Sequence, residues 1–122
     1  MKKRKALELN RVLEIQRKFV RERDWEKFHT PKNITIALGI EASELMEIFL
    51  WLTDQESKDV MKNSKTAAKI REEIADVFFW LVRLSDVLDL ELNECFFQKM
   101  GLNHKKYPVK LAKGKMTKYT EL

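Results

Sequence analysis

Two stretches of the sequence carry acidic residues three positions apart within runs of apolar residues. Glu41 and Glu44 lie in EASELMEIFLW, and Glu73 and Asp76 lie in EEIADVFFWLV. Residues three apart are neighbours on one face of a helix. Each pair therefore presents two carboxylates in the same direction, and carboxylates presented in this way can bind a hard divalent cation.

The first acid of each pair falls in the middle of the apolar stripe of its helix. At about 100° per residue, Leu45 lies roughly 40° from Glu41, and Val77 lies roughly 40° from Glu73. The second acid of each pair lies at the border of the stripe. Because an ionised carboxylate is strongly unfavourable in an apolar interior, these positions need a counter-charge.

The residues around the acids supply too little positive charge to neutralise them. No histidine or arginine lies on either stripe near the acids, and Lys69 is a single positive charge against four negative charges. We therefore expect Mg²⁺, or Mn²⁺ in its place, bound by the four carboxylates and completed by water and substrate oxygens. Such a shell leaves coordination positions for a phosphate group.

A solvated helix surface is the ordinary alternative for acids at this spacing. Two pairs that both interrupt an apolar face favour the metal site over that alternative. Glu72 lies away from the stripe and is expected at the surface, whereas Glu47 is expected either at the surface or as a further ligand. The Glu-x-x-His pairs of di-iron bundles and the HExxH motif do not occur in the sequence, which argues against oxygen chemistry.

The elements that must position these acids are helices. Apolar spacing predicts four of them, at about residues 5–23, 31–52, 65–88 and 91–106. Thr30 and Pro31 are typical of an N-cap and a first helical turn, and Asp89 is expected to cap the last helix. Residues 53–64 are expected to form a loop or a short helical turn. With only three glycines and two prolines, the chain predicts an all-α, four-helix bundle-like fold.

Length and composition predict one domain over residues 1–122, with a basic tail at about 109–122 that shows no clear period. The chain is 44% hydrophobic, and its net charge of +5 comes from a lysine-rich stretch over residues 95–120. The single cysteine, Cys95, is expected to be a small core residue in a reducing compartment. The longest apolar run, Val77 to Val82, is far shorter than the roughly 20 residues that span a bilayer. We therefore expect a soluble, cytoplasmic protein with no membrane partner.

Several motifs together resemble a known family. They are RERDWEKFHTPKN, EASELMEIFLW, EEIADVFFWLV, KMGLNHKKYPV and KYTEL, and the likeness runs from about Arg17 to Leu122. The sequence resembles the all-α nucleoside triphosphate pyrophosphohydrolases of the MazG-like superfamily, most closely their dCTP pyrophosphatase branch. The resemblance implies an Mg²⁺-dependent hydrolase that cuts between the α- and β-phosphates and releases a nucleoside monophosphate and pyrophosphate, as in cleansing of the nucleotide pool.

The resemblance also implies roles for individual residues. The metal ligands correspond to Glu41, Glu44, Glu73 and Asp76. The residues that correspond to contacts with the nucleotide are Trp25, His29, Trp51, Trp80, Lys99 and Asn103, with Lys106 and Tyr107 as weaker candidates. Stacking on an aromatic face contributes about 1–3 kcal/mol per base, and lysines offset phosphate charge. Both kinds of contact suit a nucleoside triphosphate.

Several of these assignments leave alternatives open. Trp80 centres on an apolar stripe, so core packing is its first interpretation. One carboxylate, with Glu44 as the candidate, is expected to orient or deprotonate the attacking water, and His29 as general base is a minority alternative. The family often has glycine where this chain has Ile40, and often tyrosine at the position of Trp80. These departures keep modified nucleotides among the expected substrates.

The resemblance implies a homo-oligomer, a tetramer made from dimers in which a neighbour helps to complete each active site. Two other classes of function compete with hydrolysis. A basic nucleic-acid-binding module would use the lysine-rich tail, but it leaves the acids in the apolar stripes unexplained. A non-catalytic helical assembly that senses nucleotides is the other alternative.

Overall fold

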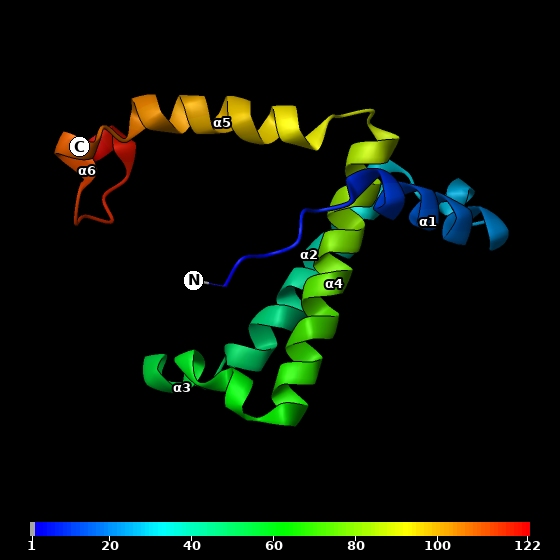
Figure 1. The fold of residues 1–122 in the computed structure, drawn as a ribbon, viewed down its shortest axis with the longest axis horizontal. Helices are drawn as coiled ribbons and strands as arrows, with labels where there is room; N and C mark the ends of the chain where they lie inside the picture. The colour runs from blue at the N-terminus through cyan, green and yellow to red at the C-terminus, as the bar shows by residue number, and fades with distance from the viewer. Residues whose placement is uncertain (1) are drawn as a thin grey trace. The chain divides into compact units, whose positions relative to one another are not determined.

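The structure is a computed structural model that describes residues 2–122, and within that range it contains helices and no strand (Figure 1). The α-helices are α1 (Leu9–Glu22), α2 (Pro31–Phe49), α3 (Asp54–Lys58), α4 (Ser64–Val87), α5 (Leu92–Lys106) and α6 (Val109–Ala112). The 3₁₀ helices are η1 (Glu26–Phe28), η2 (Val60–Lys62) and η3 (Tyr119–Glu121). The prediction of an all-α fold is confirmed.

The chain divides into two compact units, Met1–Asp89 and Leu90–Leu122. The expectation of a single domain stays a prediction. None of the described helices is long and apolar enough to cross a membrane.

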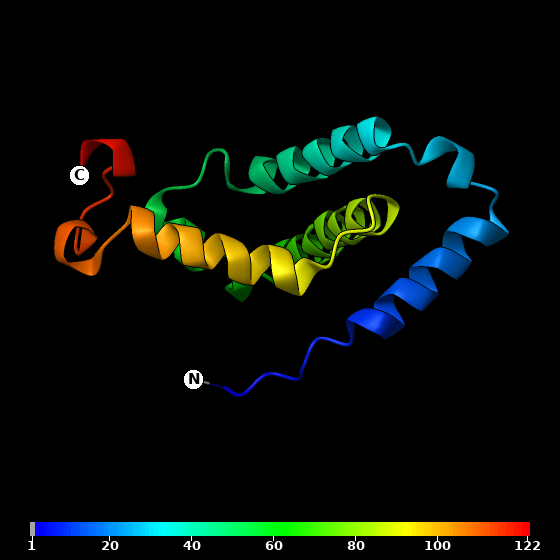
Figure 2. The same ribbon diagram turned by 90° about the horizontal axis from the view of Figure 1, so that it is seen from above.

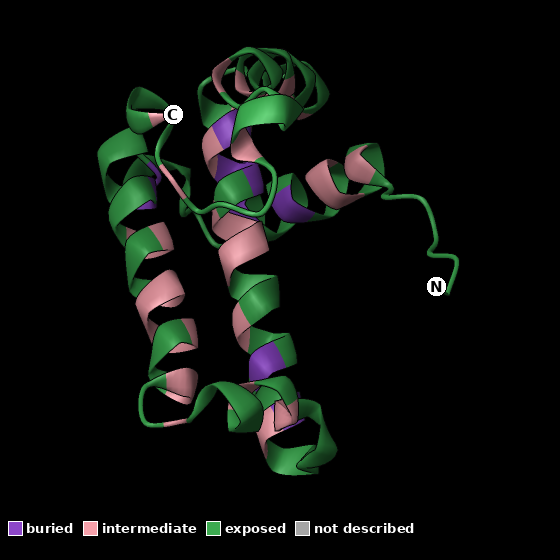
Figure 3. Cartoon of the chain, turned by 90° about the vertical axis from the view of Figure 1, so that its left-hand side faces the viewer, coloured by how far each residue is buried: buried purple, intermediate pink, exposed green. Residues whose placement is uncertain are grey.

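The first unit is organised around α2 and α4, which lie side by side and run antiparallel (Figures 1 and 2). Helix α1 packs against α4. The buried apolar residues come from these three helices and are Val20, Ile34, Ala67, Ile70 and Val82. This core is small for the length of the helices, and buried positions are few along the ribbon (Figure 3).

Side-chain caps fix where α2 and α4 begin. The Thr30 hydroxyl accepts a hydrogen bond from the backbone N–H of Asn33 at 3.2 Å, and Pro31 occupies the first turn of α2. The Asn63 side chain accepts from the backbone N–H of Thr66 at 3.0 Å, which starts α4. These bonds satisfy N–H groups that have no partner inside the helix. The predicted cap of the second helix is confirmed.

Residues 53–64 adopt the short helical alternative, as α3 and η2. Thr53 and Glu56 form a reciprocal capping box, with Thr53 Oγ1 accepting from the Glu56 N–H at 3.1 Å and Glu56 Oε1 accepting from the Thr53 N–H at 3.0 Å. This box requires extended backbone at Thr53. Helix α2 ends at Phe49, before the predicted Leu52, and the extended backbone at Thr53 separates it from α3.

The N-terminal cap of α5 differs from the prediction. The predicted cap at Asp89 is wrong, because both carboxylate oxygens of Glu91 accept the orphan N–H groups of α5, from Asn93 at 3.1 Å and Glu94 at 2.8 Å. Asp89 instead follows the end of α4 in the left-handed region, with φ of 54°. A residue in this conformation ends a helix.

Two further features of the second unit differ from expectation. Cys95 is exposed on α5, a helix in which no residue from Leu92 to Lys106 is buried, so it is not a core residue. The tail that showed no period forms α6 and η3. It is held by Tyr119, whose ring packs edge-on against Tyr107 at 6.0 Å between centroids and lies 4.7 Å from the Lys106 ammonium.

Candidate metal and nucleotide site

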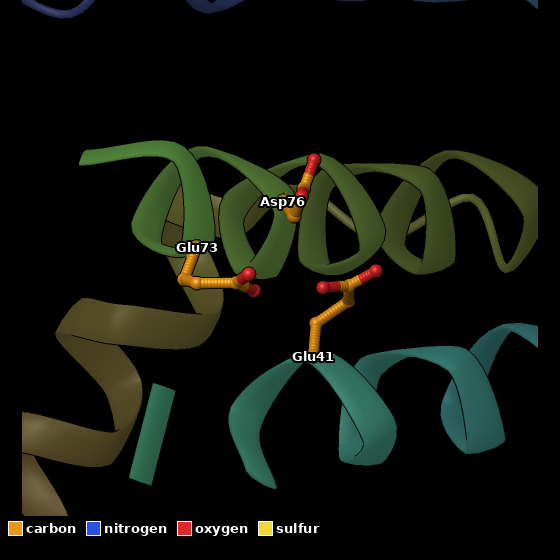
Figure 4. Close-up of side chains that lie close together, drawn as sticks. All are labelled: Glu41, Glu73 and Asp76. Carbon is orange, nitrogen blue, oxygen red and sulfur yellow. The ribbon is translucent and has the colours of Figure 1, made fainter. Parts of the chain in front are cut away.

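Three of the four predicted acids meet between α2 and α4. Glu41 extends from α2 toward α4, which carries Glu73 and Asp76 (Figure 4). One carboxylate oxygen from each of the three residues lies within 4.8 Å of the others. The faces of α2 and α4 that carry the predicted acids therefore lie opposite each other. The three oxygens are hard donors of the kind that bind Mg²⁺ or Mn²⁺.

The electrostatics of this group favour a cation. The Oε2 atoms of Glu41 and Glu73 are buried and have no hydrogen-bond partner among residues 2–122. Within the same range, no lysine, arginine or histidine forms an ion pair with the three acids. Burial, and then the carboxyl groups of Glu73, Glu44 and Asp76, raise the pKa of Glu41 to about 7. The donor set and the two orphan oxygens fit a divalent cation.

The fourth predicted acid, Glu44, occupies a different position. It is half-buried on α2, one turn after Glu41, and its carboxyl group is among the causes of the raised pKa of Glu41. It does not belong to the set of oxygens within 4.8 Å of one another. Glu47 and Glu72 are exposed, as expected for Glu72 and as in the surface alternative for Glu47.

An aromatic cluster lies beside the acidic group and joins three segments of the chain. The His29 ring contacts Trp80 edge-on at 5.2 Å between centroids and lies 6.5 Å from Trp25. Phe19 of α1 extends the cluster, packing edge-on against Trp25 at 5.7 Å and against Phe79 at 6.3 Å. Three residues predicted to bind the nucleotide, on a connector and on α4, therefore lie together.

One face of α4 carries the candidate groups in a row. Lys69, Glu73, Asp76, Trp80 and Arg83 follow one another at steps of three or four residues, a spacing that places the Cβ atoms of neighbours about 5–6 Å apart on one helix face. The acids are central, with the aromatic cluster toward the C-terminal end and Lys69 toward the N-terminal end.

An open cleft adjoins the N-terminal end of this row. It has a volume of about 580 Å³, and its lining includes Ile48, Leu52, Asn63, Thr66 and Lys69. Lys69 takes part in no ion pair within the part of the chain that the structure describes. The cleft therefore carries an uncommitted positive charge one turn before Glu73.

A second, apolar groove of about 380 Å³ lies between α1 and α4, with Gln16, Phe19, Ala75, Phe78 and Phe79 among its lining residues. On the helical projection, these residues of α4 lie on the other side of the helix from Glu73. The groove is therefore separate from the acidic group.

Five of the predicted contact residues are not brought to the acids within the first unit. Trp51 lies in the turn after α2 and is 89% exposed. Lys99, Asn103, Lys106 and Tyr107 belong to the Leu90–Leu122 unit, which is described separately. Their roles at the site stay predictions.

A buried polar network that was not predicted from the sequence lies beside the aromatic cluster. Arg83 Nε donates to His29 Nδ1 at 2.9 Å, and Arg83 Nη1 donates to Asp86 Oδ2 at 3.3 Å. Arg17 of α1 donates through Nε to the same Asp86 oxygen at 2.9 Å. Arg83 lies seven residues after Asp76, and therefore at the same border of the stripe. Its helical position could therefore have predicted that Arg83 lies near the acids. The pairing with His29 could not be predicted, because His29 lies in a connector that has no periodic pattern.

A buried amide on α1 was also missed. Gln16 donates through Nε2 to the backbone oxygen of Phe79 at 2.7 Å, and its Oε1 is buried without a hydrogen-bond partner in residues 2–122. Its place in the apolar stripe of α1, between Val12 and Val20, was the signal in the sequence.

The fold and the acidic site together define an all-α protein with a carboxylate cluster, suited to a divalent cation, between two antiparallel helices. The family comparison makes the class specific. The model of the MazG-like family matches residues 36–122, and the chain belongs to the MazG-like family. The resemblance identified from the motifs is confirmed.

Individual relatives and one solved structure agree with this assignment. The chain is 38% identical to dCTP pyrophosphatase 1 of Homo sapiens over 114 residues, covering 93% of this chain and 67% of the relative. It is 36% identical to dCTP pyrophosphatase 1 of Bos taurus, with 93% and 68% covered. A crystal structure of a pyrophosphatase from Archaeoglobus fulgidus superposes with a TM-score of 0.78 at 36% identity, over 88% of this chain and 99% of that one.

Proposed function

We propose that this protein is an Mg²⁺-dependent hydrolase that cuts nucleoside triphosphates between the α- and β-phosphates, with dCTP or a modified dCTP as substrate. The products are the nucleoside monophosphate and pyrophosphate. The observation that carries the proposal is the set of three carboxylates from α2 and α4, with buried oxygens of Glu41 and Glu73 that find no partner in the described part of the chain. Membership of the MazG-like family and the two pyrophosphatase relatives support it.

Glu41, Glu73 and Asp76 are the residues that we assign to hold the cation. When bound there, Mg²⁺ would polarise the phosphoryl oxygens and offset their charge. The three side chains fix its position from two helices whose starts are capped, so the site does not depend on a mobile loop. An uncompensated group of like charges favours the cation over an empty site.

Glu44 is the residue that we assign to the attacking water. It lies one turn from Glu41 but outside the set of oxygens within 4.8 Å of one another. A carboxylate next to the cation site, and not committed to it, can accept a proton from a water molecule and orient that molecule toward the α-phosphorus. Hydrolysis requires both a bound cation and an activated water molecule. In this proposal, Glu41, Glu73 and Asp76 hold the cation, and Glu44 activates the water.

The row of residues on α4 gives the substrate a direction. Trp25, His29 and Trp80 would hold the nucleobase at the C-terminal end of the row, where the half-buried Trp80 offers an aromatic face. The phosphates would extend past the acids toward Lys69 and the 580 Å³ cleft. In this orientation the α-phosphate lies at the acids, and the leaving pyrophosphate lies beside the lysine.

Assembly into a homo-oligomer, a tetramer as the family resemblance implies, is part of the proposal. Many large apolar side chains are exposed on α2 and α4, among them Ile36, Ile40, Met46, Ile74 and Leu81. A surface this apolar is typical of an interface between subunits. Trp51 and the residues of the second unit would then complete the nucleotide site from a neighbouring subunit.

The test is a product analysis. The protein is incubated with the four dNTPs and 5-methyl-dCTP, with Mg²⁺ or with EDTA, and the products are resolved by ion-exchange chromatography. Monophosphate and pyrophosphate in equal amounts, formed only with Mg²⁺, are expected. Diphosphate and orthophosphate would mean that a different bond is cut. Tight dNTP binding without turnover would instead favour a nucleotide sensor.

A matched pair of variants assigns the activity to the site. Glu41→Gln removes a carboxylate of the cluster, and Glu72→Gln removes an exposed carboxylate of α4. We expect Glu41→Gln to lose at least about 100-fold in kcat while it keeps its helical content, since the charge that it removes is unfavourable without metal. Glu72→Gln should match the unmodified protein. Normal turnover in Glu41→Gln would refute the assignment.

A further inference from the structure

The network around Arg83 restricts the chemistry of His29. Both residues are 8% exposed, and Arg83 Nε donates to His29 Nδ1 at 2.9 Å. Asp86 fixes the guanidinium from its other side, and Arg17 fixes Asp86. The arginine is therefore held in place by contacts from α1 and α4, and it meets the histidine on the connector between α1 and α2.

A guanidinium has donors only and stays protonated in proteins. The nitrogen that accepts its hydrogen bond, His29 Nδ1, must therefore carry a lone pair. In a neutral imidazole, the single ring proton is then on Nε2. Burial, and then the positive charge of Arg83, lower the pKa of His29, so the ring is neutral near pH 7.

The remaining nitrogen of His29 is a free donor. Across residues 2–122, no group accepts a hydrogen bond from Nε2 of His29, and the ring lies against Trp80 and near Trp25. These are the aromatic side chains that would stack on a nucleobase. A nucleobase in contact with them can present a ring nitrogen or a carbonyl oxygen to this N–H.

We propose that Arg83 is a positioning residue that holds His29 as the neutral Nε2–H tautomer, so that His29 donates a hydrogen bond to an acceptor on the nucleobase. The inference rests on the proposed function of this site. It also identifies the class of base that the site selects: a base with a hydrogen-bond acceptor on the edge that faces His29, such as N3 of cytosine. It also removes His29 from the general-base role, because neither ring nitrogen is free to take a proton.

The tautomer can be measured directly in the unmodified protein. The chain has two histidines, His29 and His104, so the ¹⁵N-imidazole NMR spectrum holds two sets of signals, and His104→Asn assigns them. We expect Nδ1 of His29 to resonate as an unprotonated nitrogen and Nε2 as a protonated one at pH 7. The opposite tautomer, or an imidazolium, would overturn the proposal.

Arg83→Met tests whether the tautomer matters for the substrate. It keeps an unbranched apolar chain of about the length of the aliphatic part of arginine and removes the donors, so the Nδ1–H tautomer and imidazolium should appear in the NMR spectrum. The loss of kcat/KM for dCTP should be about 10-fold or more and should arise mainly in KM. Arg83→Lys, which keeps a charged donor, should recover part of the loss. Arg71→Met, an exposed arginine of the same helix, is the control.

A double-mutant cycle separates positioning from a purely structural role. His29→Phe keeps the aromatic volume but has no donor. If Arg83 acts through His29, Arg83→Met should lower kcat/KM no further once His29→Phe is present. Additive losses would show that Arg83 acts on the fold alone and would overturn the proposal, as would unchanged kinetics in Arg83→Met.

A direct probe of the base completes the test. In 3-deaza-dCTP, the N3 acceptor of cytosine is replaced by a C–H group, while O2 is retained. If N3 accepts the hydrogen bond from His29, the unmodified protein should prefer dCTP to the 3-deaza analogue, and Arg83→Met should narrow that preference. Equal preference in both proteins would overturn the proposal. Failure of the proposed function would appear separately, as no metal-dependent hydrolysis of any nucleotide, while the NMR measurement would still decide the tautomer.

Discussion

Glu41 on α2 and Glu73 on α4 face each other with one oxygen each, Oε2, buried and without a hydrogen-bond partner in residues 2–122. Two like-charged groups placed in this way oppose folding unless a proton or a cation lies between them. Burial and the neighbouring carboxyl groups raise the pKa of Glu41 to about 7, which means that Glu41 holds a proton more tightly in the folded protein. A divalent cation would take the place of that proton. The protonated site and the cation-bound site lead to different predictions.

Without metal, stability should fall as pH rises from about 4.5 to about 7. Glu41 has an ordinary pKa of 4.5 and a folded-state pKa of about 7, so in this window the folded chain binds more protons than the unfolded chain. The stabilising effect of the proton is full below pH 4.5 and is lost as pH passes 7. Melting temperatures in EDTA at pH 5, 6, 7 and 8 should show this fall, and Glu41→Gln should flatten it. An equal slope in the variant would contradict the prediction.

Mg²⁺ should reverse this dependence. The cation binds the deprotonated carboxylates, so its effect on the melting temperature should grow from pH 5 to pH 8. The same scan in 10 mM MgCl₂ measures it. A rise in melting temperature that is the same at pH 5 and pH 8, or that persists in Glu41→Gln, would show that Mg²⁺ binds somewhere other than at this cluster.

Glu44→Gln and Glu73→Gln should separate the two roles of the acids. Glu73 belongs to the set of oxygens within 4.8 Å, and Glu44 does not. We expect Glu73→Gln to weaken Mn²⁺ binding, measured by calorimetry, at least about 10-fold. Glu44→Gln should retain most of the binding but lose about 100-fold or more in kcat, since a missing general base costs 10²–10⁴-fold. Equal loss of Mn²⁺ binding in both variants would assign Glu44 to the metal.

Lys69→Met should weaken the binding of both the triphosphate substrate and pyrophosphate. Lys69 lines the 580 Å³ cleft one turn before Glu73, and a charge-assisted contact to phosphate corresponds to roughly a 10- to 100-fold change in affinity. KM for dCTP and the inhibition constant of pyrophosphate should both rise, whereas dCMP inhibition should not change. Lys58→Met, on exposed α3, serves as the control. Weaker dCMP inhibition instead would reverse the direction proposed for the substrate.

Asp89→Gly should stabilise the protein. Asp89 has φ of 54° directly after α4, and glycine adopts this conformation without the steric penalty of a Cβ atom. We expect the free energy of unfolding, from urea denaturation, to rise by about 0.5–1 kcal/mol. Asp89→Ala is the matched comparison and should destabilise. A stabilising alanine variant would mean that Asp89 does not hold a left-handed conformation in solution.

The sequence determined the helices and the register of the acids. Apolar spacing and the caps at Thr30 and Asn63 act within a few residues, so local information was enough to place α2 and α4 and to put Glu41 and Glu73 on the apolar stripes of those helices. The motifs also sufficed to identify the family. The errors fell at helix ends and surfaces. The sequence predicts a cap at Asp89 and a core position for Cys95, whereas Glu91 caps α5 and Cys95 is exposed, because several polar or small residues compete at such positions at similar free energy.

The tertiary structure alone decided which groups meet across elements. The helical register predicts the direction in which Glu44 leaves α2. The way α2 packs against α4 decides that carboxylate oxygens of Glu41, Glu73 and Asp76 lie within 4.8 Å of one another and that Glu44 is not part of this group. The pairing of His29 with Arg83 joins residues 54 positions apart, and one of them lies in a connector with no period. Such contacts depend on how whole elements pack, and no short-range pattern in the sequence carries that information.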